Sequence, residues 1–231
     1  MISILYEHKD FFIVDKPAGI GFHDEHIADK KVTGFFNLCV QQLNEQLFPL
    51  HRLDKLTSGL MILGRNKSAA QWFQQAFADK QIEKIYIALA NAKPKKKQGS
   101  IIGDMEKSRN SQWKLSKTKV NPAVTRFFSY GIQQQNVSAL RLFLIKPETG
   151  KTHQIRVALK SLGAAILGDE LYGGSSSDRG YLHAYALRFT YHNQEYGFKQ
   201  LPTTGLNFVE NINQINELVE MPFDKPWPSK K

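Results

Sequence analysis

The chain has 231 residues, of which 42% are hydrophobic and 23% charged. This composition is typical of a folded globular protein with a sizeable core and excludes a disordered chain. The formal net charge of +10 favours a polyanionic partner, because excess positive charge attracts phosphate backbones. The single cysteine, Cys39, excludes an internal disulfide and a cysteine-based zinc site.

The first residues carry no targeting signal. No apolar run reaches the roughly 20 residues that a membrane-spanning helix needs. Residues 1–6 lack the basic segment and the small-residue cleavage site of a secretory signal. We therefore expect a cytoplasmic protein that makes no contact with a membrane.

Two short strands are predicted at the start of the chain. Apolar and β-branched residues dominate residues 2–6 and 11–15. Pro17 then restricts the residue before it to extended geometry, and Gly19 permits a tight turn. An ordered loop should therefore follow the second strand.

A polar loop and a helix are predicted next. Residues 21–32 contain His23 and His26, but two histidines on a loop without further ligands are weak evidence for a metal. Apolar residues then recur at the helical spacing of i, i+4, i+7 over residues 33–47. We expect no metal site and one helix here.

The densest functional stretch is HRLDKLTSGL, which begins at His51. It places a cation, Arg52, and a carboxylate, Asp54, just before an apolar run over residues 59–64 that predicts a buried strand. A strand that leaves a loop carrying such groups is a common way to present a reactive side chain. The alternative is that Asp54 only caps the turn at residues 57–59 while Arg52 lies in solvent.

A helix and a strand follow. Asn66 is a good N-cap for a helix over residues 67–79, whose apolar residues form one stripe. Residues 83–90 alternate as a strand with one core face, and Tyr86 lies on the other face. A tyrosine there can meet a ligand, or it can simply be half-buried on the sheet.

Residues 91–121 hold much of the positive charge. Charge runs of this kind are usually solvated loops, although Trp113 among the cations could stack on an unpaired base. Two antiparallel strands are predicted over residues 123–131 and 137–145, joined by a polar turn at residues 133–136.

A third helix is predicted to carry several basic residues on one face. Thr152 is an expected N-cap for a helix that runs to Leu162. His153, Arg156 and Lys160 share one face of it at i, i+3 and i+7, which would make an anion site near the positive end of the helix dipole.

The remainder contains weaker signals. Asp169 and Tyr172 lie in a glycine-bounded turn, and residues 175–180 should form a loop. The last predicted elements are a strand near residues 196–199 and a helix at 206–219, before an irregular proline-rich tail. His183 is expected to be a structural hydrogen-bonding residue.

The motifs together resemble the RluA-type pseudouridine synthases, which isomerise uridine in RNA. The resemblance rests on HRLDKLTSGL, KIYIALA and TGKTHQIR, with weaker matches in DKPAG, GDELYG and LHA, all in the order of the family over residues 11–190. It implies one α+β catalytic domain over residues 1–231, with residues 191–231 as a C-terminal extension of it. The sheet should be mixed and largely antiparallel, and no separate N-terminal RNA-binding (S4) module is expected.

The resemblance also implies the roles of individual residues. Asp54 would be the catalytic carboxylate, Tyr86 would lie against the target base, and Arg156 would pair with Asp54, an ion pair that also makes physical sense because a guanidinium favours the ionised carboxylate. Arg52 would fill the space left by the flipped nucleotide. Further RNA contacts would come from His51, Thr57, Lys151, His153 and Lys160, while Asp169 and Tyr172 would support the site.

Lys16 in the DKPAG segment would order the loop near the active site or contact a phosphate. Two positions depart from the family pattern: Lys151 replaces the commoner arginine, and Ala158 stands where histidine is frequent. Both are expected to affect RNA contacts more than chemistry.

The expected substrate is structured ribosomal or transfer RNA, and not DNA, bound by a monomer without a metal or cofactor. One alternative is an RNA-binding protein without catalytic activity, for which Asp54 would be dispensable. Another is a metal-free hydrolase of the glycosidase kind, which needs a second facing carboxylate. The only further acid in the motifs that resemble the family's catalytic ones is Asp169, which is expected in a supporting turn.

Overall fold

The structure is a computed structural model that describes residues 2–27, 30–133 and 140–229. Its helices are α1 (Phe35–Leu43), α2 (Lys67–Ala78), α3 (Gln154–Ser161), α4 (Leu206–Val209), α5 (Ile212–Val219) and the 3-10 helix η1 (Glu170–Tyr172). Its strands are β1 (Ser3–Glu7), β2 (Phe11–Lys16), β3 (Glu25–Ile27), β4 (Lys30–Val32), β5 (Phe48–Pro49), β6 (Thr57–Gly64), β7 (Glu83–Ala90), β8 (Gln98–Gly103), β9 (Met105–Lys107), β10 (Trp113–Leu115), β11 (Ala123–Ile132), β12 (Leu140–Pro147), β13 (Leu182–Tyr191) and β14 (Gln194–Lys199).

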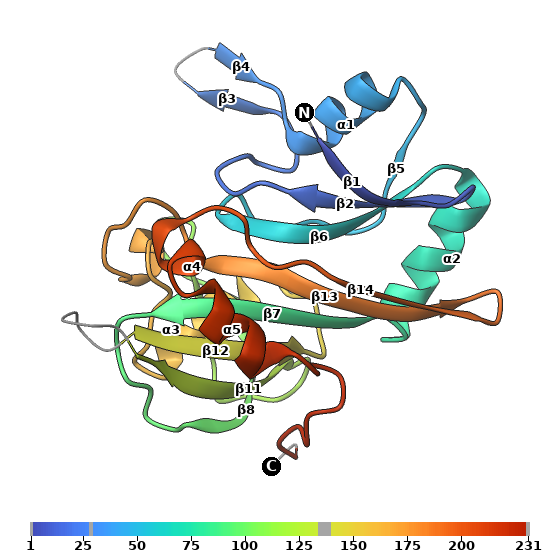
Figure 1. Cartoon of the computed structure of the whole chain (residues 1–231). Helices are drawn as coiled ribbons and strands as arrows, with labels where there is room; N and C mark the ends of the chain where they lie inside the picture. The colour runs from blue at the N-terminus through green and yellow to red at the C-terminus, as the bar shows by residue number, and fades with distance from the viewer. Residues whose placement is uncertain (1, 28–29, 134–139, 230–231) are drawn as a thin grey trace.

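Ten of the described strands form one twisted sheet (Figure 1). The main path runs β1-β2-β6-β13-β7-β12-β11-β8, while β14 pairs with β13 and β5 pairs with β6. Strands β6 and β13 are parallel, and the other pairs in this sheet are antiparallel. The α+β fold with a mixed, largely antiparallel sheet is therefore confirmed.

Helices cover both faces of the sheet. In the N-terminal half, α2 packs with Phe11, Leu60 and Ile62, whereas α1 packs with the alternate side chains, such as Val14 and Met61. In the other half, α3 lies behind strands β7 and β12, and α4 and α5 lie in front of them (Figure 1). The period of two along β2 and β6 thus divides the apolar side chains between two layers.

The centre of the sheet aligns the strands that carry the candidate site. Every residue of β6 is buried, and Gly59 has a φ of +109°, with a hypothetical Cβ only 2.4 Å from the carbonyl oxygen of Ala184. A larger residue would push β6 away from β13. Ala184 pairs with Gly59 on one side and with Tyr86 of β7 on the other, so the start of β6 lies one strand away from Tyr86.

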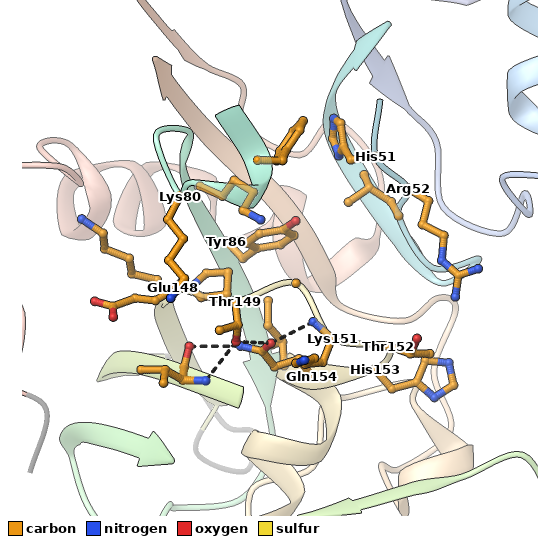
Figure 2. A pocket seen from close by; sticks show the side chains of 18 of the residues that line it. His51, Arg52, Lys80, Tyr86, Glu148, Thr149, Lys151, Thr152, His153 and Gln154 are labelled. Carbon is orange, nitrogen blue, oxygen red and sulfur yellow. Dashed lines mark hydrogen bonds between the residues drawn. The ribbon is translucent and has the colours of Figure 1, made fainter. Parts of the chain in front are cut away.

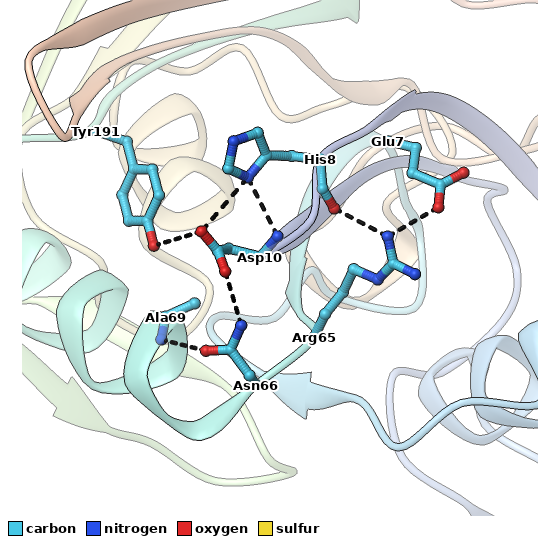
Figure 3. A network of polar contacts seen from close by, with 7 residues as sticks. All are labelled: Glu7, His8, Asp10, Arg65, Asn66, Ala69 and Tyr191. Carbon is cyan, nitrogen blue, oxygen red and sulfur yellow. Dashed lines mark hydrogen bonds and ion pairs between the residues drawn. The ribbon is translucent and has the colours of Figure 1, made fainter.

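A polar network fastens the first hairpin to the rest of the N-terminal half (Figure 3). The Asp10 carboxylate accepts hydrogen bonds from Asn66 at 2.8 Å and from the Tyr191 hydroxyl at 3.2 Å. Asn66 in turn accepts a bond from the Ala69 backbone N–H at 2.8 Å, which is the predicted N-cap of α2. One turn between β1 and β2 is thereby linked to α2 and to the end of β13.

Several predicted helices and strands differ at their ends. The helix predicted over 33–47 stops at Leu43, because Asn44 adopts a left-handed conformation with φ 50°. The helix predicted over 206–219 is divided into α4 and α5, because Asn211 leaves helical geometry at φ −112°, ψ 15°. By contrast, β7 has the predicted bounds, and α2 ends within one residue of its predicted end.

Two stretches predicted as loops contain short hairpins. Strands β3 and β4 pair within the stretch 21–32, and β8 and the β9–β10 hairpin lie within 91–121. Strands of three residues, with charged side chains among them, have no apolar alternation that could predict them.

The predicted antiparallel pair after residue 122 is present as β11 and β12. The predicted turn at 133–136 falls mostly on residues 134–139, which lie outside the described residues, as does the start of the predicted strand over 137–145. Across the described part of the chain, no helix is long and apolar enough to cross a membrane.

Candidate active site

A cleft of about 1150 Å³ opens where the loop before β6, strand β7 and the loop before α3 meet (Figure 2). Tyr86 lies in its middle, between His51 on one side and Thr149 and Gln154 on the other (Figure 2). The three motifs singled out in the sequence therefore line one cavity.

Asp54 is held at the entrance to β6. Its carbonyl oxygen accepts a hydrogen bond from the Thr57 backbone N–H at 2.9 Å, which closes the turn into the strand. Its side chain is 21% exposed, and its Oδ2 lies 3.7 Å from Nη1 of Arg156. The predicted ion pair between Asp54 and Arg156 is therefore present.

Asp169 holds Arg156 more firmly than Asp54 does. Its carboxylate accepts bonds from Arg156 Nε at 2.8 Å and Nη2 at 2.7 Å, and the side chains of both residues are nearly excluded from solvent. This bidentate geometry fixes the guanidinium plane, and it leaves Nη1 directed to Asp54. The turn around η1 thus positions the cation that faces Asp54.

Tyr86 presents a neutral phenol to the cleft. It is half-buried between two apolar clusters. Burial raises the pKa of its hydroxyl, and the negative charge of Asp54 raises it further. The hydroxyl is therefore protonated near neutral pH and can donate a hydrogen bond to a ligand.

Lys16 is a structural residue of the site. It is completely buried, and its ammonium donates to the carbonyl oxygens of Pro17 and Thr57 at 2.9 Å and of Asp54 at 3.4 Å. Burial lowers its pKa to about 8, so the group is still charged near neutral pH. Lys16 orders the loop as predicted, and its burial rules out the phosphate contact that the sequence left open.

Replacing Lys16 with methionine should lower the free energy of unfolding by about 3 kcal/mol, because three carbonyl oxygens would lose a buried charged donor. Urea unfolding would measure the change, with exposed Lys9→Met as the control for loss of one positive charge. Equal stability of the two variants would show that the carbonyl oxygens of the loop do not depend on the ammonium group.

Basic residues of the α3 motif gather around the ring of Tyr172. The Arg156 guanidinium lies 4.8 Å and the Lys160 ammonium 5.5 Å from the ring centre, and His153 Nδ1 lies 2.8 Å from the hydroxyl. The same hydroxyl accepts a bond from the Trp113 backbone N–H at 2.9 Å. Tyr172 thus links strand β10 to the active site.

The predicted N-cap of α3 is wrong. His153 occupies the cap position in a left-handed conformation with φ 55°, no side chain caps the helix, and α3 begins at Gln154. Gln154 instead accepts bonds from the Lys151 backbone and the Thr149 hydroxyl at 3.0 and 2.7 Å. That network, drawn in Figure 2, holds the loop before the helix.

The residues predicted to contact RNA lie in different settings. Arg52 is exposed, and the Lys151 ammonium reaches Asn121 at 2.9 Å. Thr57 is 2% exposed, so its side chain is part of the scaffold. Burial lowers the pKa of His51 to about 3, and its Nε2 accepts a bond from the Ile62 backbone at 2.9 Å. His51 is therefore neutral and cannot act as a phosphate-binding cation.

Arg52 stands between two hollows. A second cavity of about 600 Å³ lies toward the loop after β2. The two cavities share Arg52, Asp54, His153 and Arg156. A substrate that enters either hollow therefore meets the same carboxylate and the same exposed arginine.

No cluster of three or more histidine, cysteine or acidic residues that could hold a metal is present in the described ranges. His183 makes two structural bonds, from Nδ1 to the Ser58 hydroxyl at 2.7 Å and from Nε2 to the Gln200 carbonyl oxygen at 2.8 Å. Its predicted structural role fits these contacts.

Comparison with known families agrees with this geometry. The sequence model of a family described as RNA pseudouridylate synthase matches residues 10–161. The chain belongs to this family. The synthase motifs that it covers include Asp54, Tyr86 and Arg156, which the fold brings to one cleft.

Individual relatives cover nearly the whole synthase. A protein of Haemophilus influenzae named "Uncharacterized RNA pseudouridine synthase" is 46% identical over 99% of both chains. A "Ribosomal large subunit pseudouridine synthase D" of Borreliella burgdorferi is 30% identical over 94% of this chain and 70% of its own length. The solved structure named "Human RNA Pseudouridylate Synthase Domain Containing 1" matches with a TM-score of 0.77 at 22% identity, over 99% of this chain and 97% of its own. That last likeness concerns the fold alone.

Proposed function

We propose that this RNA pseudouridine synthase uses Asp54 as its catalytic carboxylate on uridines of ribosomal or transfer RNA. The observation that carries the proposal is the arrangement in one cleft of a part-exposed carboxylate, a fixed guanidinium 3.7 Å from it and a neutral phenol. The proposal includes one catalytic domain that acts as a monomer in the cytoplasm. A relative named for ribosomal large-subunit modification supports ribosomal RNA as the first substrate to test.

The isomerisation breaks the bond between N1 of uracil and C1′ of ribose, turns the base and joins C5 to C1′. C5 loses a proton and N1 gains one, so the nucleotide has the same atoms before and after the reaction. The base must leave its stack to expose this bond. Asp54 would act at the ribose, either on C1′ or on the C2′ proton, and Arg156, 3.7 Å away, would hold the carboxylate in place. The exposed side chain of Arg52 would fill the space that the flipped uridine leaves between its neighbouring bases.

The test is to incubate the purified protein with unmodified ribosomal and transfer RNA and to map pseudouridine chemically, with the Asp54→Asn variant in parallel. A site-specific signal from the unaltered protein alone would support both the reaction and the residue. RNA from a strain that lacks the protein would identify the cellular site. Binding to these RNAs without product, together with no missing pseudouridine in that strain, would favour an RNA-binding protein without catalytic activity.

Replacing Tyr86 with phenylalanine should slow product formation by about 10²-fold, the usual scale for losing one positioned proton donor or acceptor, and should change RNA affinity little because the ring is kept. Single-turnover rates and binding curves on the mapped RNA would measure both. Tyr130→Phe, which removes a half-buried hydroxyl outside the cleft, is the control. Full activity of Tyr86→Phe would mean that the ring acts by packing alone.

A further inference from the structure

Lys84 is a lysine of the cleft that the proposed chemistry does not use. It lies on β7, two residues before Tyr86, and lines the same cavity. Two residues along a strand span about 6.6 Å and return to the same face. Lys84 and Tyr86 therefore lie on the same face of β7 and line the same cavity.

The Lys84 ammonium lies near Phe77 and Gly150. It lies 5.3 Å from the centre of the Phe77 ring at the end of α2. On its other side, a hypothetical Cβ on Gly150 would lie 3.8 Å from Nζ. The absence of a side chain at Gly150 leaves the ammonium uncovered where the cleft continues along the loop before α3.

Among the described residues, no carboxylate is paired with Lys84 and no acceptor is hydrogen-bonded to its ammonium. Burial lowers its pKa, and no acidic neighbour opposes that effect. Lys16, which is completely buried near the site, has three carbonyl acceptors, whereas Lys84 is half-buried. Lys84 is thus a partly desolvated cation without a partner, which is a cost unless a ligand supplies one.

His51 adds a neutral donor to the same end of the cleft. Its ring lies 4.8 Å from that of Phe77, and the charge of Lys84 contributes to lowering its pKa. Because its Nε2 accepts a bond from the Ile62 backbone, a neutral ring must carry its proton on Nδ1. This end of the cleft therefore offers one cation, Lys84, and one neutral N–H, on His51, with no acidic side chain paired to either among the described residues.

We infer that Lys84 and His51 form a phosphate subsite for the nucleotide whose base lies on Tyr86. The inference rests on the proposed function, because RNA supplies one phosphate for each nucleotide. A compact ammonium acts as a point charge and suits a phosphate oxygen in any orientation. A contact with a neutral base edge is the alternative that the experiment separates from it.

The test uses the salt dependence of binding to a short fluorescent oligouridylate. Each phosphate neutralised on single-stranded RNA contributes about 0.7 to the slope of log affinity against log salt. The variants are Lys84→Met, Lys84→Arg and Lys67→Met, the last removing an exposed charge at the far end of α2. We expect the slope to fall by about 0.7 in Lys84→Met, and to be unchanged in the other two.

Equal slopes for Lys84→Met and the unaltered protein would overturn the inference. An affinity loss at constant slope would assign Lys84 to a base, and no loss would remove it from the binding site. The pseudouridine assay is independent of this result. A slope change without any pseudouridine product would support the phosphate subsite at Lys84 and contradict the proposed catalytic function. Pseudouridine product with equal slopes would support the catalytic function and contradict the subsite.

Folding of Lys84→Met can be checked in the same experiment. The folded pKa of Lys84 is lowered, so the unfolded chain holds this proton more tightly and the ammonium reduces stability near neutral pH. Methionine should leave the melting temperature equal or higher at pH 7. As pH rises through the lowered pKa toward the ordinary lysine value of about 10.4, the free energy of unfolding of the unaltered protein should increase relative to that of the variant.

Discussion

Replacing Asp54 with asparagine should lower the rate of pseudouridine formation by about 10³-fold or more, since a positioned acid–base group contributes up to about 10⁴ and a nucleophilic carboxylate more. Asparagine has nearly the same shape but no charge and little nucleophilicity. Arg156 keeps its two bonds to Asp169 at 2.8 and 2.7 Å, so the site should hold its form and RNA affinity should change little.

Single-turnover rates on the mapped RNA, with binding measured in parallel, would test this expectation. The matched control is Asp224→Asn, which removes an exposed carboxylate in the C-terminal tail. A variant of Asp54 that keeps a tenth or more of the rate would refute the assignment of this residue. Loss of both rate and folding would be detected by urea unfolding, and would point to a structural role for Asp54.

Replacing Asp169 with asparagine should lower the free energy of unfolding by about 3–5 kcal/mol, the usual cost of removing one partner from a buried ion pair. The Asp169 side chain is 1% and the Arg156 side chain 7% exposed. The guanidinium would lose its close ion pair and keep the longer charged contact to Asp54, at 3.7 Å. Because domains of this kind are stable by about 5–15 kcal/mol, such a loss would unfold a marginal protein.

A double variant separates stability from function in this pair. Arg156→Met combined with Asp169→Asn removes the unpaired buried charge, so the free energy of unfolding should recover by about 2 kcal/mol or more relative to Asp169→Asn alone. Activity should stay low, because Asp54 would lack its cation. Recovery of activity together with stability would show that Arg156 acts only as part of the core.

Patterns of local periodicity predicted the elements that carry the site. The residue types of strand β7 alternate between a core face and the face of Tyr86, so its bounds and the placement of this half-buried tyrosine follow from the sequence. The N-cap at Asn66 could be predicted because it involves only residues that are close in the sequence. The pairing of Asp54 with Arg156 required the family resemblance, because nothing local relates residues about 100 positions apart.

Contacts between distant residues could not be predicted in the same way. Lys16 donates to carbonyl oxygens 38 and 41 residues away. Every residue has a backbone carbonyl, so the residue types do not indicate which of them accept a hydrogen bond. His51 was expected on the RNA, but it is neutral and its Nε2 is bonded to β6. The absence of a partner for Lys84 depends on which elements end at the cleft, which only the assembled sheet decides.

The parallel contact between β6 and β13 has a consequence for the synthesis of the protein on the ribosome. Ser58, at the start of β6, bonds to His183 across 125 residues, and Gly59 pairs with Ala184 at the same place. The strand that follows Asp54 therefore gains its neighbour only when about four-fifths of the chain has been made. Folding dominated by such long-range pairing is slow, so we expect the cleft around Asp54 to form only after β13 has been synthesised.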